Sequence, residues 1–136
     1  MNDRLFVLLV HDDPEPFATL RQALRQMGIE TFSVATCQDA KQLISQCKPH
    51  IVFTGDAVAD GSWLRVLRMA EDSEVPLNVI VVGALPDMKK YISVMEGGAF
   101  DFVAPPFEHE PLEFVVRSAA LDAHHRREAS VRAFLT

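Results

Sequence analysis

Cysteine, tryptophan and tyrosine are scarce in this sequence, and long hydrophobic runs are absent. The two cysteines, Cys37 and Cys47, stand ten positions apart on one predicted helix and face different directions, so they indicate neither a disulfide nor a metal pair. The apolar run from Leu5 to Val10 is shorter than a secretion signal. No run is long enough to span a membrane. These absences favour a cytoplasmic protein with reduced thiols.

Positive charge is also in short supply. The chain has 13 Lys and Arg residues against 19 Asp and Glu residues, a net charge of −6 and a pI near 5.3. A surface that binds nucleic acid through its phosphates needs clustered basic residues, so we expect no direct nucleic-acid binding. With 136 residues, 49% of them hydrophobic, the chain can bury one core and is too short for two ordinary domains.

The sequence does contain an alternation of two hydrophobic patterns. Short β-branched runs such as 51–53 and 79–82 suit strands that are buried on both faces. Between them apolar residues recur at helical spacing, with Leu24, Leu64 and Tyr91 among those predicted to face the sheet. This order predicts βαβ units and an α/β fold with helices on both faces of a parallel sheet. The predicted strands lie near residues 4–10, 30–34, 50–54, 78–83 and 101–104, and the helices near 14–27, 37–47, 62–72, 87–97 and 109–123.

Capping residues mark several helix boundaries. Thr36 followed by Asp39 resembles a capping box, and Asp87 can cap the fourth helix. Residues 1–123 are expected to form one domain. Residues 124–136 have too little apolar sequence to form a core, so they are expected to be a helical extension or a linker to an output domain.

An acidic pair follows the first predicted strand, at the edge of the sheet where such folds place their sites. The strand ends in His11-Asp12-Asp13, and adjacent carboxylates are tolerable when solvated or when they share a hard cation such as Mg²⁺. In the structural alternative, Asp13 caps the helix that opens at Pro14 and Asp12 is simply solvated. His11 is expected to be hydrogen-bonded beside the pair rather than a ligand. The pair alone does not decide between these interpretations.

Four segments, in their order and spacing, resemble the receiver domain of bacterial two-component response regulators: VLLVHDDPEPFATLRQAL, KPHIVFTGDAVADGSWLRVL, VPLNVIVVGA and GGAFDFVAPPFEHEPLEFVVRSA. The resemblance covers about residues 4–120. It implies a flavodoxin-like three-layer sandwich with parallel strands in the order 2-1-3-4-5. It also implies Mg²⁺ held by acidic residues, an aspartate phosphorylated by a histidine kinase, and a switch built from a hydroxyl residue and an aromatic one.

Within this resemblance the acidic pair stands where the family holds its metal, whereas the phosphoacceptor position is vacant. Counting six residues on from Pro49 and five back from Asp60 both give Gly55. Asp56 is then one step out of place, and one step along a strand reverses the face to which a side chain points. Only a bulge, which Gly55 would tolerate, could bring Asp56 into that role.

The other positions that the resemblance assigns to the phosphoryl response are changed as well. The switch hydroxyl corresponds to Gly83, the phosphate-pairing lysine to Pro105, and the switch aromatic to Phe102, which has no hydroxyl. A phosphoryl group here would meet only acidic side chains, although its transfer depends on charge neutralisation. The family commonly holds the corresponding Lys-Pro bond cis, so the Pro105–Pro106 bond is expected to be cis. Trp63, near the predicted pocket mouth, is expected to fill the vacant volume.

The expected function is therefore a receiver-type signalling module, not an enzyme, that acts by protein contacts independently of phosphorylation. Its expected partner is a histidine kinase or an output domain, or a second copy of the chain in a homodimer. No cofactor is required, and weak Mg²⁺ binding by Asp12 and Asp13 is the most that we expect. Two alternatives stay open: a phosphorylatable regulator that uses Asp56, and a flavodoxin-like module in which Gly55 and Gly83 leave room for a small molecule.

Overall fold

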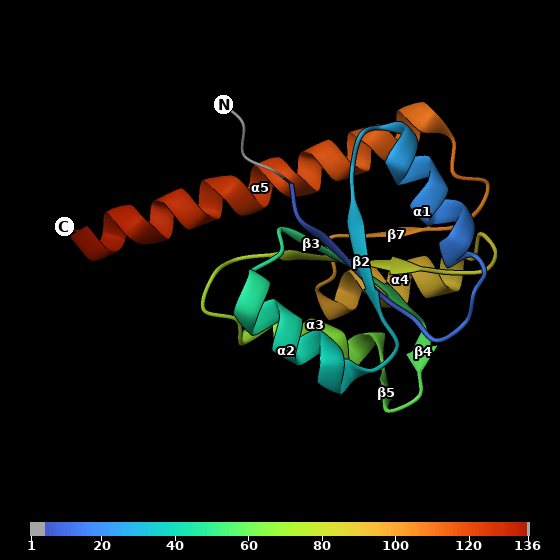
Figure 1. Ribbon diagram of the computed structural model, residues 1–136, viewed down its shortest axis with the longest axis horizontal. Helices are drawn as coiled ribbons and strands as arrows, with labels where there is room; N and C mark the ends of the chain where they lie inside the picture. The colour runs from blue at the N-terminus through green and yellow to red at the C-terminus, as the bar shows by residue number, and fades with distance from the viewer. Residues whose placement is uncertain (1–4, 136) are drawn as a thin grey trace.

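The computed structural model describes residues 5–135, which form a parallel sheet with helices on both faces (Figure 1). The strands of this sheet are β1 (Val7–Val10), β2 (Thr31–Val34), β3 (Ile51–Gly55), β6 (Asn78–Val82) and β7 (Asp101–Val103). The helices are α1 (Phe17–Gln26), α2 (Cys37–Cys47), α3 (Trp63–Glu71), α4 (Met88–Gly97) and α5 (His109–Leu135). A hairpin that the sequence did not predict, β4 (Ala57–Val58) with β5 (Gly61–Ser62), precedes α3. The sheet order β2-β1-β3-β6-β7 confirms the predicted α/β sandwich.

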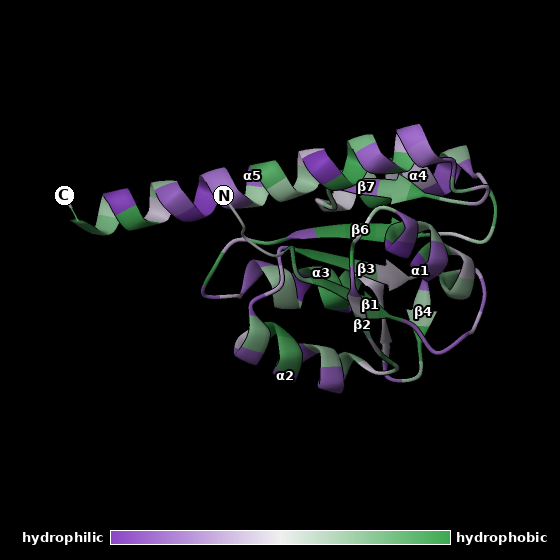
Figure 2. Cartoon of the chain, turned by 45° about the horizontal axis from the view of Figure 1, so that its top comes forward, coloured by the Kyte–Doolittle hydropathy of each residue, from purple (hydrophilic) through white to green (hydrophobic). Residues whose placement is uncertain are grey.

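Alternate residues of the central strands supply two separate hydrophobic cores. In β1, Val7 and Leu9 pack with α1 and α5, whereas Leu8 and Val10 pack with α2 and α3. All four side chains are fully buried. Figure 2 shows the central strands β3 and β6 in the green of hydrophobic residues. A period of two with both faces covered is the pattern of a parallel sheet, and this pattern fixes the strand ends that form the candidate site.

Side-chain caps fix the predicted starts of two helices. The Thr36 hydroxyl accepts a hydrogen bond from the Asp39 N–H at 3.1 Å, and the Asp87 carboxylate accepts one from the Lys90 N–H at 3.2 Å. Both predicted caps are confirmed. The structural alternative for Asp13 is wrong, because α1 begins later than predicted and its N-cap is Pro16, with no side-chain cap.

Helix α5 is much longer than the predicted 109–123. Its first half buries Leu112, Val116, Ala119 and Ala123 against the sheet. The helix then continues without a break to Leu135, through the segment predicted as an extension or a linker, and runs well past the other elements (Figure 1). Among residues 5–135 there is no helix with the length and apolar character needed to cross a membrane.

Candidate functional site

The carboxyl ends of β1, β3 and β6 surround a cavity of about 510 Å³, which we call the strand-end pocket. Its walls come from the loop after β1, the start of the β4–β5 hairpin, the loop before α4, and one residue of β7. The predicted site positions that line it are Asp12, Asp13, Gly55, Asp56, Gly83 and Phe102. The structure therefore brings these positions together, while Pro105 lies outside the lining.

The acidic pair lies at the rim of this pocket, with both carboxylates exposed. As predicted, His11 is hydrogen-bonded beside the pair: its Nδ1 lies 2.7 Å from the carbonyl oxygen of Asp13, and its ring stacks on Phe17 with the centroids 4.2 Å apart. A carbonyl oxygen only accepts, so Nδ1 carries the proton and donates.

The other ring nitrogen of His11, Nε2, has a different environment. Nε2 is buried and has no hydrogen-bond partner among the described residues. Burial lowers the pKa of His11, the hydrogen bond to the Asp13 carbonyl partly opposes this, and the nearby charge of Arg21 lowers the pKa further. The histidine is therefore held neutral, and it contributes no positive charge to the strand-end pocket.

Gly55 is the last residue of β3 and is buried. β3 pairs with β6 in unbroken register through Gly55 and Val82, so no bulge moves Asp56 into the acceptor position. A Cβ at Gly55 would lie 3.6 Å from Cε1 of Phe17 and 3.9 Å from the carbonyl oxygen of Val10, which are ordinary contacts. The position has space for a Cβ, but glycine offers no nucleophile.

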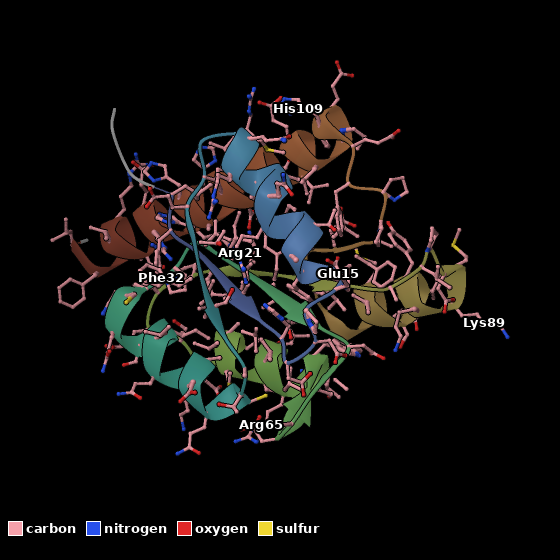
Figure 3. The ribbon with its side chains drawn as sticks, turned by 45° about the vertical axis from the view of Figure 1, so that its right-hand side comes forward. Glu15, Arg21, Phe32, Arg65, Lys89 and His109 are labelled. Atoms are coloured by element: carbon pink, nitrogen blue, oxygen red, sulfur yellow. The ribbon has the colours of Figure 1, made fainter. Side chains whose placement is uncertain are left out.

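Asp56, the alternative acceptor, follows β3 directly. Its side chain is 54% exposed and forms an ion pair with Lys90 of α4, with 2.7 Å between Oδ1 and Nζ. Figure 3 shows the preceding Lys89 pointing away from the domain, whereas Lys90 lines the strand-end pocket. The prediction that a phosphoryl group would meet only acidic side chains is therefore wrong. Lys90 was missed because no local pattern links it to a residue 34 positions away.

Gly83 comes directly after β6, and its environment differs from that of Gly55. A Cβ here would lie 2.5 Å from Cζ and 2.9 Å from Cε1 of Phe102, closer than real contacts allow. Phe102, on β7, is only 9% exposed. Its ring thus occupies the space of a side chain at position 83, so this position lacks a hydroxyl and has no room for one while the ring stays there.

Two predictions near the pocket have different outcomes. The Pro105–Pro106 bond is cis, as predicted. Trp63, however, does not fill the strand-end pocket. A Cβ at Gly97 of α4 would lie 2.8 Å from Cη2 of Trp63, so the indole packs between α3 and α4 instead. Trp63 starts α3 and is partly buried there, so its position in the sequence was a misleading guide to the pocket.

Asp60, which served only as a counting mark in the sequence, has a structural role. Its two carboxylate oxygens accept hydrogen bonds from the N–H groups of Cys37 at 2.6 Å and Gln38 at 3.1 Å, at the start of α2. The bond from the Cys37 N–H is the main reason that the pKa of Asp60 is lowered. This contact fastens the β4–β5 hairpin to α2, so Asp60 is not available to the strand-end pocket.

Comparison with known proteins identifies the family. The family model of the response regulator receiver domain matches residues 7–117. The chain belongs to this family. It is 37% identical over 117 residues to the C4-dicarboxylate transport transcriptional regulatory protein DctD of Pseudomonas aeruginosa. The aligned region covers 83% of this chain and 24% of the relative. The chain thus spans about a quarter of that relative's length.

Solved structures agree with this assignment. The signal receiver domain of a putative Luxo repressor protein from Vibrio parahaemolyticus has 26% identity and a TM-score of 0.73, over 88% of this chain and 95% of that chain. A putative response regulator from Chloroflexus aurantiacus, at 23% identity and a TM-score of 0.78, supports the fold over 88% of this chain and 99% of that chain. The chain is therefore a receiver, a signalling module.

The Mg²⁺ that the receiver family implies does not fit the side chains of this pocket. Within residues 5–135 no group of three or more His, Cys, Asp or Glu side chains is arranged to hold a metal ion. Gly55 supplies no third oxygen ligand beside the acidic pair, and Asp56 is paired with the ammonium group of Lys90. Hard cations need several oxygen ligands. We therefore derive no chemistry through a metal.

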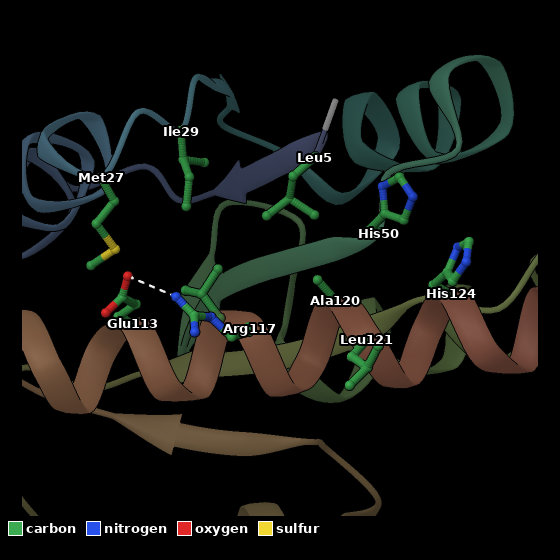
Figure 4. Close-up of a pocket in the computed structure, with 10 residues that line it drawn as sticks. Leu5, Met27, Ile29, His50, Glu113, Arg117, Ala120, Leu121 and His124 are labelled. Carbon is green, nitrogen blue, oxygen red and sulfur yellow. Dashed lines mark hydrogen bonds and ion pairs between the residues drawn. The ribbon is translucent and has the colours of Figure 1, made fainter. Parts of the chain in front are cut away.

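A larger cavity, of about 710 Å³, lies between α5 and the segments that lead into β1, β2 and β3 (Figure 4). Its floor is mainly apolar, with Met27, Ile29 and Leu121 among the lining side chains, and the Glu113–Arg117 ion pair stands on one side. None of the predicted site residues lines this cavity. His50 and His124 also line it, but it contains none of the positions that the receiver family uses, so the strand-end pocket remains the candidate site.

Proposed function

We propose that this receiver signals through protein contacts and without accepting a phosphoryl group. The observation that carries the proposal is the side-chain-free position at the end of β3, where Gly55 faces the strand-end pocket. Receivers act through an aspartate at this position, and a backbone atom cannot replace a carboxylate nucleophile. The unbroken β3–β6 register keeps Asp56 one residue beyond it.

Two further contacts support the proposal. The carboxylate of Asp56 is neutralised by Lys90, and the Phe102 ring fills the place of the hydroxyl side chain at Gly83. Phosphoryl transfer asks a protein mainly for positioning and charge neutralisation. In this pocket the ammonium group of Lys90 already forms an ion pair with Asp56, so it does not neutralise a phosphoryl group. We propose that the receiver works without a metal cofactor.

The proposal is tested by incubation of the whole chain with Mg²⁺ and acetyl phosphate, followed by intact-mass measurement. A phosphorylatable receiver in the same reaction is the positive control. We expect no phosphoryl adduct on this chain. A stoichiometric adduct that disappears in the Asp56→Asn variant would overturn the proposal and establish Asp56 as the acceptor.

The surface of α4 and α5 is where we place the protein contacts. Exposed apolar side chains lie on α4, in the loop before it and on α5: Leu85 is 72% exposed, Met88 71%, Ile92 48% and Phe114 73%. Such side chains in number mark an interaction surface. The proposed partner is a histidine kinase, an output domain or a second copy of the chain, in the cytoplasm. Met88→Glu should weaken whichever complex forms, as read by sedimentation velocity of the chain alone and with the candidate partner.

A further inference from the structure

The second half of α5 runs outward from the domain, and arginines in its first turn bind the edge of the sheet. The last α5 residue buried in the core is Ala123, and residues 128–135 are exposed. Figures 1 and 2 show this part of α5, which we call the arm (residues 124–135), extending beyond the sheet. The arm continues a helix that is anchored in the core, and contacts in its first turn bear on the direction in which it leaves the domain.

Arg126 provides the first contact between the arm and the sheet. Its Nε donates to Asp122 at 2.9 Å, and its Nη2 donates to the Asn78 side-chain oxygen at 2.7 Å and to the Leu77 carbonyl at 3.3 Å. Asn78, at the start of β6, is buried and donates in turn to the Ala119 carbonyl at 2.8 Å. Arg126 thus joins the arm to the amino-terminal end of a central strand.

Arg127 makes a second set of contacts with a different part of the domain. Its Nε donates to the carbonyl of Pro76 at 2.7 Å. Its Nη2 donates to the carbonyls of Pro49 at 2.7 Å and Lys48 at 3.1 Å. One planar guanidinium therefore bridges the loop that leads into β3 and the loop that leads into β6, which a lysine ammonium cannot do with the same fixed geometry.

We propose that Arg126 and Arg127 form a clamp that sets the direction in which the arm leaves the domain. The two side chains lie one turn beyond the last buried residue, and they take hold of the amino-terminal edge of the sheet at β3 and at β6. A helix held on two loops at once cannot swing about Ala123 without breaking several hydrogen bonds. The arm therefore keeps a fixed orientation relative to the sheet. A partner that binds the arm is held in a fixed orientation relative to the sheet as well.

Pulsed electron resonance on the whole chain measures this directly. Spin labels are placed at Lys89→Cys, on the outward side of α4, and at Phe134→Cys near the end of the arm, in a Cys37→Ala, Cys47→Ser background. We expect a narrow distance distribution that widens at least about twofold in the Arg126→Gln, Arg127→Gln variant, because local helix ends open when their tertiary contacts are removed. Amide exchange of residues 128–134 should speed up while Ala119 stays protected.

Arg117→Gln is the matched control, since it removes an arginine from the same helix and breaks only an exposed ion pair with Glu113. It should leave the distribution unchanged. Emission from Trp63, the single tryptophan, reports whether the domain stays folded. If the double variant unfolds, Arg127→Gln alone tests the clamp, because water can hydrate the carbonyls it releases near the surface. A clamp variant with a folded domain and a distribution as narrow as the control would overturn the proposal.

Discussion

Two glycines at the carboxyl edge of the sheet occupy neighbouring strand ends, and the space beside each is different. At Gly55 the nearest atom to an added Cβ lies at 3.6 Å, whereas at Gly83 the Phe102 ring lies at 2.5 Å. Neither glycine has a positive φ, so the backbone would accept another residue at both. The space beside Gly55 is open, whereas the space beside Gly83 is filled by the Phe102 ring. A pocket can thus lose two functional side chains with very different structural consequences.

The largest expected effect comes from the ring that fills the second vacancy. Phe102→Ala should lower the free energy of unfolding by about 3 kcal/mol, at the lower end for large-to-small core substitutions because the ring lies at the edge of the core. Urea unfolding followed by Trp63 emission measures it. A loss well below 1 kcal/mol would mean that the ring is not packed against Gly83, and the contrast between the two glycines would disappear.

The contrast itself predicts opposite signs for one substitution at two sites. Gly83→Ala should destabilise the domain by about 1–2 kcal/mol, because Phe102 must move. Gly55→Ala should stabilise it by about 0.5 kcal/mol, because the folded state loses nothing and the unfolded chain loses freedom. Urea unfolding midpoints of the two variants check both signs.

A double-mutant cycle then identifies the cause. In a Phe102→Ala background the cost of Gly83→Ala should vanish, while the effect of Gly55→Ala should stay as it was. A cost at Gly83 that persisted without the ring would show that the backbone, and not Phe102, requires the glycine.

Local patterns in the sequence predicted the scaffold well. The alternation of elements predicted a parallel sheet covered by helices, the resemblance to receivers implied the strand order, and Thr36 and Asp87 cap the helices as their positions indicated. The buried sides of α3 and α4 were predicted less well: Leu64 and Tyr91 are each 41% exposed, and Val66 and Val94 are buried instead. Short helices offer few turns from which to determine a face.

Long-range contacts were outside the reach of such patterns. The Lys90–Asp56 pair, the Phe102 ring beside Gly83 and the reach of Arg127 to Pro49 each join residues that only the folded sheet brings together. The sequence showed that the functional groups at Gly55 and Gly83 are missing. It could not show that one space stays open while the other is filled, because that depends on side-chain directions across neighbouring strands.

A variant that restores an aspartate at position 55 tests whether the open space at Gly55 is enough for function. Gly55→Asp fits the open space, and repulsion from Asp12 and Asp13 should cost less than about 1 kcal/mol without metal. We expect no conformational response to beryllofluoride with Mg²⁺ in amide exchange, because Gly83 and Pro105 offer no contact that would favour a second state. The triple variant Gly55→Asp, Gly83→Thr, Pro105→Lys is the comparison. A full response from the single variant would show that Gly55 alone silences this receiver.

The surroundings of Gly55 also predict a pH dependence. Phe17, the nearest neighbour of a Cβ there, stacks on His11, whose pKa is lowered by burial. The unfolded chain then takes up a proton more readily than the folded one, so stability is fully present above about pH 6.5 and falls as the pH drops through and below that value. His11→Gln should flatten this part of the stability curve, by less than either glycine substitution changes stability. The exposed His109→Gln is the control, and an equal flattening there would contradict the assignment.

The smallest expected effect concerns the ion pair next to Gly55. Lys90 and Asp56 are 32% and 54% exposed, and such an exposed pair contributes about 0.2 kcal/mol, the low end of the usual range, and less at high salt. Lys90→Gln should therefore lower stability slightly, and more than Lys89→Gln, whose side chain points away from the domain in Figure 3. The variant also frees the Asp56 carboxylate. We still expect no adduct from acetyl phosphate, because the β3 register keeps Asp56 beyond the acceptor position. If Lys90→Gln became phosphorylated at Asp56, the ion pair, and not the vacancy at Gly55, would be what keeps this receiver silent.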